Sequence, residues 1–517
     1  MQILINDIKM PKEHTKEQVI EAAREIVRLA CVSAKNYHIY RQSLDARRKS
    51  NIHYVYAVTA EADSETGIGG KIRKIDIAEE LSVIKKPLKT RPVVVGMGPC
   101  GLFAAWILTL SGNPPLIIER GDDVDSRAES VRNFWRTGIL DKNSNVQFGE
   151  GGAGTFSDGK LNTRISDPKQ RFVLKTFADF GAPADIMYKA KPHIGTDKLR
   201  GTVKNMRNKL IELGAEVRFN TCVTDIRIKN GSLCGAELSD GGFAECENLI
   251  LAIGHSSRDT YERLCVGGVG LEPKPFAIGA RIEHSQSFID GLQYGETRGL
   301  PPADYRVVYN GSERSCYSFC MCPGGTVVNA SSEEKMLAVN GMSCYARDGR
   351  NANSALVVNV RPGDFEGGVL GGMELQRRYE ALAFKAGGGD GKAPVQLAED
   401  FVKDRPSESL GSVIPTVTSG FRLAELKKCL PPFVADTLRE GLINFERRMK
   451  GFASNGAVLT GIESRTSAPL RILRGESMQS VNVCGLYPSG EGAGYAGGIV
   501  SAAVDGIRCA LALIDND

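Results

Sequence analysis

The chain has no long hydrophobic run: no apolar stretch in its 517 residues approaches the roughly 18 residues that a membrane span needs. Its first residues, MQILINDIKMPKEHTKEQ, lack the basic and apolar regions of a secretory signal peptide. The sequence therefore predicts a cytoplasmic protein that makes no use of a membrane. Its length is too great for a single hydrophobic core, so two or three domains are expected.

A disulfide framework is also missing. The 13 cysteines are odd in number and scattered, a pattern that indicates reduced thiols, many of them in the core. The net charge of +4 is close to neutral for a chain of this length, which argues against general polyanion binding. What remains is a protein with the ordinary apolar and charged fractions of a globular fold.

The strongest motif begins at residue 92. Pro92–Val95 has the β-branched composition of a strand that is buried on both faces. It leads into Gly96-Met-Gly-Pro-Cys-Gly101, a G-x-G-x-x-G, and then into a helix predicted over 99–110. In this motif the first glycine permits a tight turn, the second lets a pyrophosphate approach the backbone, and the third lets the helix pack against the strand. The helix N-terminus offers free N–H groups to phosphate.

A second strand, Leu116–Ile118, ends in Glu119 about 20 residues after the motif, where a carboxylate accepts ribose hydroxyls. A carboxylate at this place would repel a 2′-phosphate. The sequence therefore predicts FAD or NAD, and not NADP, at this site.

Residues 1–90 are predicted to form a small α+β domain. Residues 1–91 hold 17 Lys or Arg and 12 Asp or Glu, so the basic excess of the chain lies here. A basic turn, residues 43–50, separates two predicted strands. It is either a solvated hairpin turn or a surface for RNA, an acidic protein or a phosphorylated ligand, and these alternatives stay open.

A glycine-rich segment, residues 145–160, follows a helix predicted over 124–137. Such a density of glycine is tolerated where a chain passes close to a flat or anionic group. In a flavoprotein that group is the isoalloxazine ring with its ribityl phosphate. Thr155 and Ser157 are candidates for hydrogen bonds to the ring edge. Lys160 is a candidate for a place near flavin N1 or N5 or for binding an anionic substrate; the alternative is a surface lysine.

The C-terminal end supplies a second cofactor fingerprint. Residues 481–494, VNVCGLYPSGEGAG, form a strand that ends in Gly490-Glu491 and leads to a glycine-rich helix start. Glu491 is expected to accept ribityl hydroxyls, and the N–H groups before the last helix are expected to face flavin N1 and O2. Because both ends of a flavin site are present, FAD is favoured over NAD.

The composition changes between residues 266 and 464, and we interpret this region as an inserted substrate domain. It holds no second strand–G-x-G-x-x-G–helix unit, so any NAD(P)H is expected to bind transiently. Arg281 and His284 close a predicted strand; Arg281 is a candidate for holding a substrate carboxylate and His284 for proton transfer. The alternative is an ordinary ion pair at a sheet edge.

Cys320 and Cys322 lie in the same region. On a regular strand they point to one face but lie too far apart along it for easy disulfide geometry. Their spacing matches no zinc or iron–sulfur pattern. They are either core thiols or redox-active or substrate-contacting thiols at the end of the strand.

Six longer segments extend the comparison to a known family. NVQFGEGGAGTFSDGKL (145–161), KPHIGTDKL (191–199), KPFAIGARIEH (274–284), YSFCMCPGG (317–325), ESRTSAPLRI (463–472) and GLYPSGEGAGYAGGIVSAAVDG (485–506) resemble a bacterial family of uncharacterised FAD-dependent dehydrogenases. More distantly, GMGPCG, ILAIGHS and GLYPSGEGAG resemble the glutathione-reductase-like flavoprotein superfamily. Glu491 stands where many of those relatives have aspartate, and the redox C-x₄-C of the disulfide reductases is missing after the first helix. The resemblance implies FAD and a redox reaction without naming a substrate.

Together these features predict an α/β protein with a Rossmann-like, three-layer (ββα) FAD-binding domain. The predicted domains are a basic α+β domain (1–90), the first part of the FAD domain (91–265), the inserted mixed α/β substrate domain (266–464) and the C-terminal part of the FAD domain (465–517). The predicted function is hydride transfer between flavin N5 and a small molecule. The alternative is a flavoprotein whose basic domain binds RNA or protein, and a third option is a flavoenzyme that modifies RNA. The predicted catalytic residues are Lys160, Arg281 and His284, and no metal site is expected. The predicted cofactor residues are Gly96, Gly98, Pro99, Cys100, Gly101, Glu119, Arg120, Gly152, Thr155, Ser157, Val223, Ala252, Gly254, Gly490, Glu491, Gly498 and Ile499.

Overall fold

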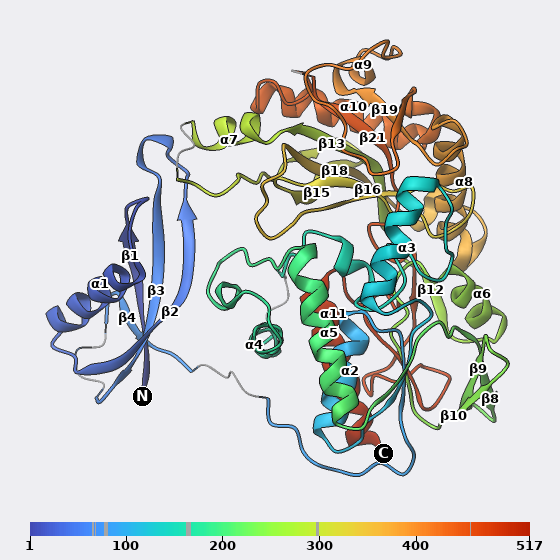
Figure 1. The fold of residues 1–517 in the computed structure, drawn as a ribbon, viewed down its shortest axis with the longest axis horizontal. Helices are drawn as coiled ribbons and strands as arrows, with labels where there is room; N and C mark the ends of the chain where they lie inside the picture. The colour runs from blue at the N-terminus through green and yellow to red at the C-terminus, as the bar shows by residue number, and fades with distance from the viewer. Residues whose placement is uncertain (65–66, 68, 77–80, 162–166, 296–298, 455) are drawn as a thin grey trace.

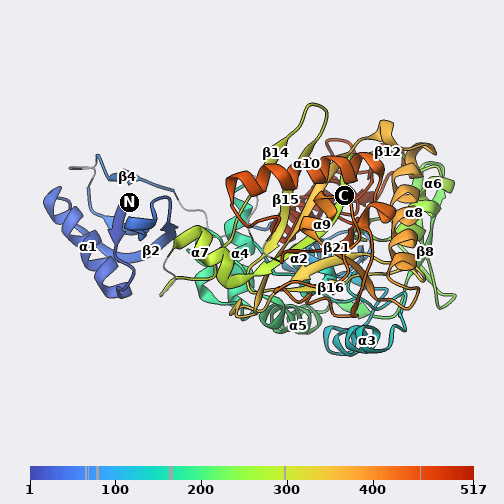
Figure 2. The ribbon, with the colours of Figure 1, turned by 90° about the horizontal axis from the view of Figure 1, so that it is seen from above.

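The computed structural model describes residues 1–64, 67, 69–76, 81–161, 167–295, 299–454 and 456–517. Figure 1 shows three parts: a small N-terminal domain on the left, a nucleotide domain at the lower right, and an inserted domain above it. Seen from above, the N-terminal domain stands at one end of the molecule (Figure 2). The structure is a mixed α/β fold with parallel and antiparallel sheets, which confirms the predicted fold class.

The N-terminal domain is a four-stranded antiparallel sheet in the order β2-β3-β1-β4 with one helix packed on it. Its elements are β1 Gln2–Met10, α1 Lys16–Leu29, β2 Ala34–Asp45, β3 His53–Ala62 and β4 Ile72–Lys74. Thr15 begins the helix with a capping box: its hydroxyl accepts from the Gln18 backbone, and the Gln18 side chain accepts from the Thr15 backbone. Val19, Ala23 and Val27 bury the apolar helix face against the sheet.

The nucleotide domain is built on a five-stranded parallel sheet in the order β23-β11-β5-β6-β7. These strands are β5 Val93–Val95, β6 Leu116–Ile118, β7 Glu216–Arg218, β11 Leu249–Leu251 and β23 Leu486–Pro488. The last strand comes from the C-terminal end of the chain, so residues on both sides of the inserted domain form one sheet.

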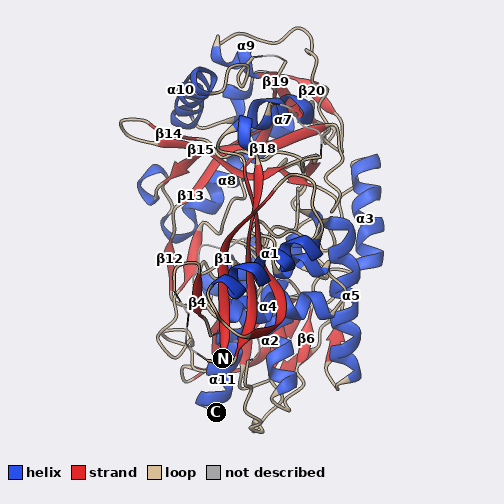
Figure 3. Ribbon diagram, turned by 90° about the vertical axis from the view of Figure 1, so that its left-hand side faces the viewer, coloured by secondary structure: helices blue, strands red, loops and turns tan. Residues whose placement is uncertain are grey.

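Successive side chains of these short strands point to opposite faces of the sheet. The sheet is therefore covered on both faces, and the domain has three layers. Val94, Ile117 and Ile250 pack against helices, including α2 Pro99–Leu110, α5 Thr196–Glu212 and α11 Ile499–Asn516. Their neighbours in sequence point to the opposite face and pack against a three-stranded antiparallel layer in the order β10-β9-β8. That layer consists of β8 Val223–Lys229, β9 Ser232–Leu238 and β10 Phe243–Glu245. In Figure 3 the N-terminal domain stands in front of this part of the molecule, and α3 and α5 are seen at its side.

The inserted domain contains a seven-stranded mixed sheet in the order β14-β15-β18-β13-β21-β19-β20. All its strands fall within the range predicted for this domain: β13 Phe276–Ser285, β14 Val308–Asn310, β15 Ser315–Cys322, β18 Asn351–Val360, β19 Ala393–Leu397, β20 Phe421–Leu423 and β21 Val458–Glu463. A short pair, β16 Thr326–Asn329 and β17 Val339–Met342, lies beside it. Another pair, β12 Leu271–Pro273 and β22 Leu470–Ile472, joins the entry and exit of the insertion.

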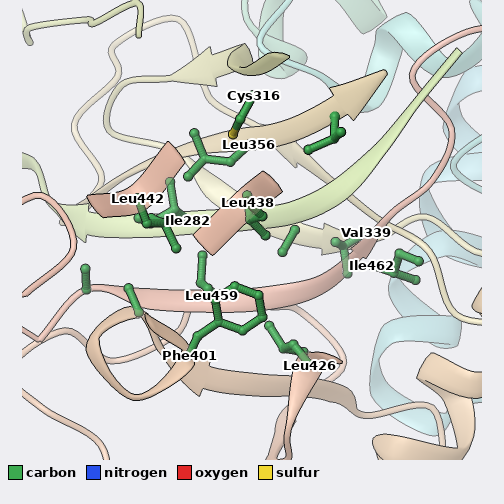
Figure 4. Close-up of a cluster of buried hydrophobic side chains, with 14 of the residues drawn as sticks. Ile282, Cys316, Val339, Leu356, Phe401, Leu426, Leu438, Leu442, Leu459 and Ile462 are labelled. Carbon is green, nitrogen blue, oxygen red and sulfur yellow. The ribbon is translucent and has the colours of Figure 1, made fainter. Parts of the chain in front are cut away.

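The main core of the inserted domain lies between this sheet and α10 Pro432–Arg448. Figure 4 shows Leu438 and Leu442 of the helix gathered with Ile282, Cys316 and Leu356 of three strands. The remaining helices are α3 Val124–Thr137, α4 Lys169–Asp179, α6 Arg258–Val266, α7 Gln286–Tyr294, α8 Gly371–Ala386 and α9 Ala398–Val402. No helix among the described residues is long and apolar enough to cross a membrane.

The basic turn of the N-terminal domain lies against the rest of the molecule. Ile52 is buried in the core of the inserted domain, and Leu44 and Ala46 pack against that core. The backbone of Gln42 exchanges two hydrogen bonds with Tyr188 and Ala190, at 2.7 and 2.8 Å. The tip of this hairpin therefore serves as an intramolecular contact.

Candidate functional site

The dinucleotide turn lies at the carboxyl end of β5. Gly96 has a φ of +98°, and a Cβ there would lie 2.3 Å from the carbonyl oxygen of Ala252 on the neighbouring strand. A Cβ on Gly101 would lie 1.9 Å from the carbonyl oxygen of Gly96, so only glycine lets α2 pack this close to the turn. Gly98 is the N-cap of α2, and Pro99 begins the helix.

The glycine-rich segment closes over this turn. A Cβ on Gly152, whose φ is +61°, would lie 3.0 Å from the Cα of Gly98. Two stretches of bare backbone therefore face one cavity, next to the N-terminus of α2. Glycine at both positions lets the two loops lie this close, because a side chain at Gly152 would push them apart, and the backbone N–H groups of the helix start stay accessible to a pyrophosphate.

Glu119 holds the two loops together. Its Oε2 accepts from the Met97 N–H at 2.7 Å, and its Oε1 accepts from the Gly121 and Gly149 N–H groups at 3.0 and 2.9 Å. A carboxylate has about four acceptor positions, so three are used by the backbone and one remains for a ribose hydroxyl. The residue predicted as a nucleotide ligand is thus also a structural clamp.

Arg127 on α3 supports the glycine-rich segment from behind and is fully buried. Its guanidinium donates to five carbonyls, those of Asn145, Val146, Gly149, Glu150 and Gly152, and to the Thr155 hydroxyl. Burial lowers its pKa to about 9. Sequence reasoning missed this residue, because one arginine in an amphipathic helix gives no signal that it points inward.

These contacts correct the prediction for Thr155. Its hydroxyl is buried, donates to the Gly152 carbonyl at 2.9 Å and accepts from Arg127 at 2.7 Å, outside the cavity lining. Ser157 does line the cavity, and its hydroxyl donates to the Gly154 carbonyl at 2.8 Å. Thr155 shapes the loop, whereas Ser157 faces the cavity.

The C-terminal fingerprint forms another part of the wall. Glu491 lines the cavity, and burial raises its pKa to about 7. His255 lies opposite, with Nε2 4.0 Å from Oε1 of Glu491, and burial together with nearby arginines lowers its pKa to about 4. Gly498 is the N-cap of α11, so the amino end of this helix also points to the cavity.

One cavity of about 510 Å³ joins these parts. Most predicted cofactor residues line it: Gly96, Gly98, Pro99, Cys100, Glu119, Arg120, Gly152, Ser157, Val223, Ala252, Gly254, Glu491, Gly498 and Ile499. Gly101 and Gly490 lie behind the wall instead, since a Cβ on Gly490 would lie 2.8 Å from the Cys100 sulfur. Their role is to permit close packing.

Residues of the inserted domain complete the cavity. Its lining there includes Tyr305, Arg306, Cys320, Met321, Asn340 and Glu463. Lys160 bridges the two domains: its ammonium lies 3.2 Å from an Asp158 oxygen and donates to the Met321 carbonyl of β15. Burial lowers the pKa of Lys160, but the Cys322 and Cys320 thiols and Asp158 outweigh burial, so its pKa is raised.

The structure corrects the grouping of Arg281 with His284. The two residues are three apart on β13, so they point to opposite faces of the sheet. Arg281 is fully buried behind the cavity wall; it pairs with Glu463 through two bonds of 3.0 Å and donates to Asn353 at 2.6 Å. It therefore positions Glu463, which lines the cavity, and does not itself reach a substrate.

His284 lies on the α10 side of the sheet, outside the cavity lining. Its Nε2 lies 2.7 Å from the Phe452 carbonyl, its ring packs on Phe288 and Phe452, and burial lowers its pKa to about 4. The prediction that it transfers a proton to or from a substrate is wrong, because its ring is buried among aromatic side chains and is not part of the cavity lining.

The comparisons with known proteins agree with this architecture. Residues 275–466 match the family described as "FAD-dependent protein, C-terminal domain-like", and residues 1–61 match a domain of unknown function, DUF8436. A protein of Clostridium beijerinckii described as uncharacterized is 50% identical, and the match covers 100% of this chain and 99% of the relative.

Solved structures of flavoproteins are similar at lower levels. They include the flavin-dependent brominase Bmp2 (13% identity, 83% and 80% of the two chains, TM-score 0.37) and a geranylgeranyl bacteriochlorophyll reductase-like protein of Thermoplasma acidophilum (13%, 82% and 77%, 0.34). Glycine oxidase of Bacillus cereus is 12% identical over 83% and 96% of the two chains, with a TM-score of 0.31. The resemblance to the glutathione-reductase-like superfamily stays a prediction.

We base the cofactor assignment on the family match and on the cavity. The bare backbones at Gly98 and Gly152, the spare acceptor on Glu119 and the helix N-termini at residues 99 and 499 fit a dinucleotide, and the domain that completes the cavity is of an FAD-dependent type. The cofactor is FAD. The chain belongs to the same family as the C. beijerinckii protein and carries the FAD-dependent protein C-terminal domain.

Proposed function

We propose that this FAD-dependent protein is an oxidoreductase that transfers a hydride between flavin N5 and a small-molecule substrate. One observation carries the proposal: a single cavity is lined both by the dinucleotide motif and by strands of the inserted domain. A cofactor in the first part of this cavity would share an enclosed space with a molecule in the second. The inserted domain is then the substrate domain.

Bound FAD supplies the hydride chemistry, and the protein supplies binding, orientation and electrostatics. Gly98 and Gly152 would flank the pyrophosphate, Glu119 would accept from the ribose, and Ser157 and Glu491 would face the flavin. On the substrate side, Lys160 presents a cation and Glu463 a carboxyl group whose pKa is raised by burial. Arg281 orients Glu463 from behind.

Lys160 is the candidate for contact with an anionic or polar substrate group. It reaches the cavity from the glycine-rich segment and is held by Asp158, which Arg347 fixes through a bond of 3.0 Å. Because this cation is already paired, its main expected effect is on substrate orientation and on the charge of the cofactor. Residues 266–464 hold no strand–G-x-G-x-x-G–helix unit, so NAD(P)H is a candidate for transient binding in the same cavity.

The first experiment is the anaerobic visible spectrum of the purified protein before and after addition of NADH and then NADPH. Bleaching of the flavin band by either nucleotide would identify a nicotinamide-linked reductase. Persistence of the band with both would direct the search to substrates that donate electrons themselves. Absence of a flavin band after reconstitution with FAD would refute the proposal.

A further inference from the structure

The inserted domain places two cysteines at the substrate side of the cavity. Cys320 is half-buried and lines the cavity, whereas Cys322 is fully buried behind it. A break in register between Phe319 and Cys322 interrupts the pairing of β15 with β18, and Cys320 itself has a φ of +46°. This conformation is uncommon for a residue other than glycine and is found at functional sites.

The bulge turns the Cys322 thiol back onto the backbone of Cys320. On a regular strand, residues two apart are separated by about 6.6 Å along the chain, which is the reason to expect no direct contact. Here the register break lets the Cys322 thiol turn back onto Cys320, and it donates to the Cys320 carbonyl oxygen at 3.3 Å. The expectation that these thiols lie too far apart assumed an unbroken strand, and the strand is broken at this site.

Two cations face this pair from other elements. Arg281 of β13 donates to the Cys320 carbonyl at 3.2 Å, and Lys160 donates to the carbonyl of Met321, the residue between the two cysteines. Other charged groups nearby are Asp158, which pairs with Lys160, Glu463, which pairs with Arg281, and Glu491, which lines the same cavity. The Cys322 hydrogen bond and then the two cations outweigh burial and lower the pKa of Cys320 to about 5.

We infer that Cys320 is a nucleophilic thiolate that reacts with a small disulfide in the substrate part of the cavity, and that Cys322 is the second thiol that completes the exchange. The inference rests on the proposed function, since it names a substrate class for the same cavity. The exchange requires only the two cysteines and the substrate disulfide. Reduction of the resulting Cys320–Cys322 disulfide would be a separate step at the FAD site.

The exchange is balanced without another reagent. The Cys320 thiolate attacks one sulfur of the disulfide, the substrate S–S bond breaks, and one thiolate leaves while a mixed disulfide forms. The Cys322 thiol loses its proton to that thiolate and attacks the Cys320 sulfur, which releases the second thiolate. The substrate gains two electrons, and the protein loses them as a Cys320–Cys322 disulfide.

The arrangement favours a disulfide over a carbon electrophile. A cysteine that forms a covalent adduct with carbon needs water or another acceptor to release it, and a second thiol in contact has no part in that step. A mixed disulfide, in contrast, is released by a second thiol. Cys322 is shielded from the cavity, and its thiol donates to the Cys320 carbonyl, which keeps it next to the residue that a resolving thiol must reach.

The test uses the full-length, FAD-loaded protein, reduced, desalted and then treated anaerobically with bis(2-hydroxyethyl) disulfide. Peptide mass spectrometry is expected to show a Cys320–Cys322 disulfide in the wild type, a stable mixed disulfide on Cys320 in Cys322→Ser, and neither product in Cys320→Ser. Cys344→Ser removes an exposed thiol and is the matched control, which should behave as wild type at positions 320 and 322. An unmodified Cys320 in Cys322→Ser, under conditions that modify Cys344 in the same molecule, would overturn the inference.

A second measurement needs no substitution. The rate of alkylation by iodoacetamide at Cys320 in the wild type is followed between pH 6 and pH 9. A thiol with a pKa of about 8.5 or higher accelerates by more than about 100-fold over this range, and Cys344, whose pKa is raised, should do so. Cys320 should change by less than about twofold. A Cys320 profile that rises like that of Cys344 would also overturn the inference.

The two proposals fail separately. Loss of the flavin band in all forms of the protein refutes the proposed function. The other outcome is a protein that keeps its FAD, has its flavin band bleached by an electron donor, and has an unreactive Cys320. That outcome refutes only the disulfide inference and leaves the proposed function in place.

Discussion

At the scale of single residues, the cofactor site depends on charged side chains that no ligand touches. Arg127 is the clearest case, since its guanidinium satisfies five carbonyls of the loop that faces the cavity. A loop rich in glycine has little intrinsic order, so such a clamp determines whether the cavity keeps its shape.

Replacing Arg127 by methionine should therefore cost both stability and FAD affinity. A hydrogen bond from a charged donor contributes about 1.5–3 kcal/mol, so the loss of several should exceed about 3 kcal/mol. Thermal unfolding and the FAD:protein ratio after gel filtration measure the two effects. Arg136→Met on the same helix is the control, because Arg136 is exposed and bonds only to Asn133. A variant that unfolds at the wild-type temperature and keeps its FAD would contradict this role for Arg127.

Glu491 should give the bound flavin a pH dependence. Because burial raises the pKa of this carboxyl group to about 7, it is neutral below that pH and charged above it. A carboxylate next to the cofactor disfavours negative charge on the reduced flavin, so the midpoint potential of the wild type should fall below that of Glu491→Gln above pH 7. The two potentials should converge below pH 6. Parallel potentials from pH 5 to pH 9 would show that Glu491 does not titrate beside the flavin.

At the scale of elements, the nucleotide domain is held by the contact between its first and last helices. A Cβ on Gly506 of α11 would lie 2.1 Å from the Cys100 carbonyl oxygen of α2. Residues more than 400 positions apart thus fix the helix that begins at the dinucleotide turn.

Gly506→Val should separate these helices and reduce FAD binding. Overpacking of a well-packed core typically costs about 1–3 kcal/mol, and the shift acts directly on the turn at Gly98. Gly201→Ala is the matched control, because a Cβ at this helical position in α5 meets nothing within 4 Å. That variant should be neutral or more stable by about 0.4–1 kcal/mol in urea unfolding. Equal effects of the two substitutions would show that the close contact is unimportant.

A buried ion cluster joins the nucleotide and inserted domains. Glu380 of α8 accepts from Arg258 of α6 at 2.7 Å and from Arg465, after β21, at 2.8 Å. Burial raises the pKa of Glu380, but the two guanidinium groups outweigh burial and hold the pKa well below its usual range.

Glu380→Gln should leave the buried guanidinium of Arg465 without its counter-charge and Arg258 with Glu333 alone, and it should cost about 3–5 kcal/mol. Since the folded pKa is depressed, the stability that this carboxylate contributes is present above about pH 4 and is lost as the pH falls further. Urea unfolding at pH 7 and pH 3 should therefore show a large difference between wild type and variant at pH 7 and a smaller one at pH 3. The same difference at both values would rule out the ionic contribution.

At the scale of the whole molecule, the N-terminal domain is attached through its hairpin tip. Ile52 enters the core of the inserted domain, and Arg47 and Lys49 beside it stay exposed. The alternative function, in which this domain binds RNA or a protein, remains a proposal that depends on these exposed cations.

Ile52→Lys should release the hairpin without affecting the FAD site. Burying an isoleucine is worth about 1.5–3 kcal/mol, and a lysine cannot replace that contact. Limited proteolysis should cut the segment between the N-terminal and nucleotide domains faster, while the flavin spectrum stays unchanged. Lys49→Ala is the control, and it should digest like the wild type. Unchanged proteolysis of Ile52→Lys would mean that the contact contributes nothing to docking.

The sequence by itself determined the parts of this protein whose signals are contiguous. Helices Pro99–Leu110 and Val124–Thr137 begin and end where the sequence predicted, because caps, glycines and proline mark their termini locally. The dinucleotide turn, Glu119 and the C-terminal fingerprint were predictable for the same reason: each function needs fixed residue types at a fixed spacing. The cofactor FAD and the α/β fold class followed from these motifs, and both predictions are confirmed.

Only the tertiary structure decided which side chains face the cavity. Strand alternation alone separates Arg281 from His284, but which face meets the cofactor depends on how the inserted domain packs on the nucleotide domain. Arg127 turns inward because of a loop more than 15 residues away, and the Cys322 thiol reaches the Cys320 carbonyl because of a bulge in the pairing of β15 with β18. Burial, register and the direction of a side chain are set by long-range contacts, which no local pattern of residues encodes.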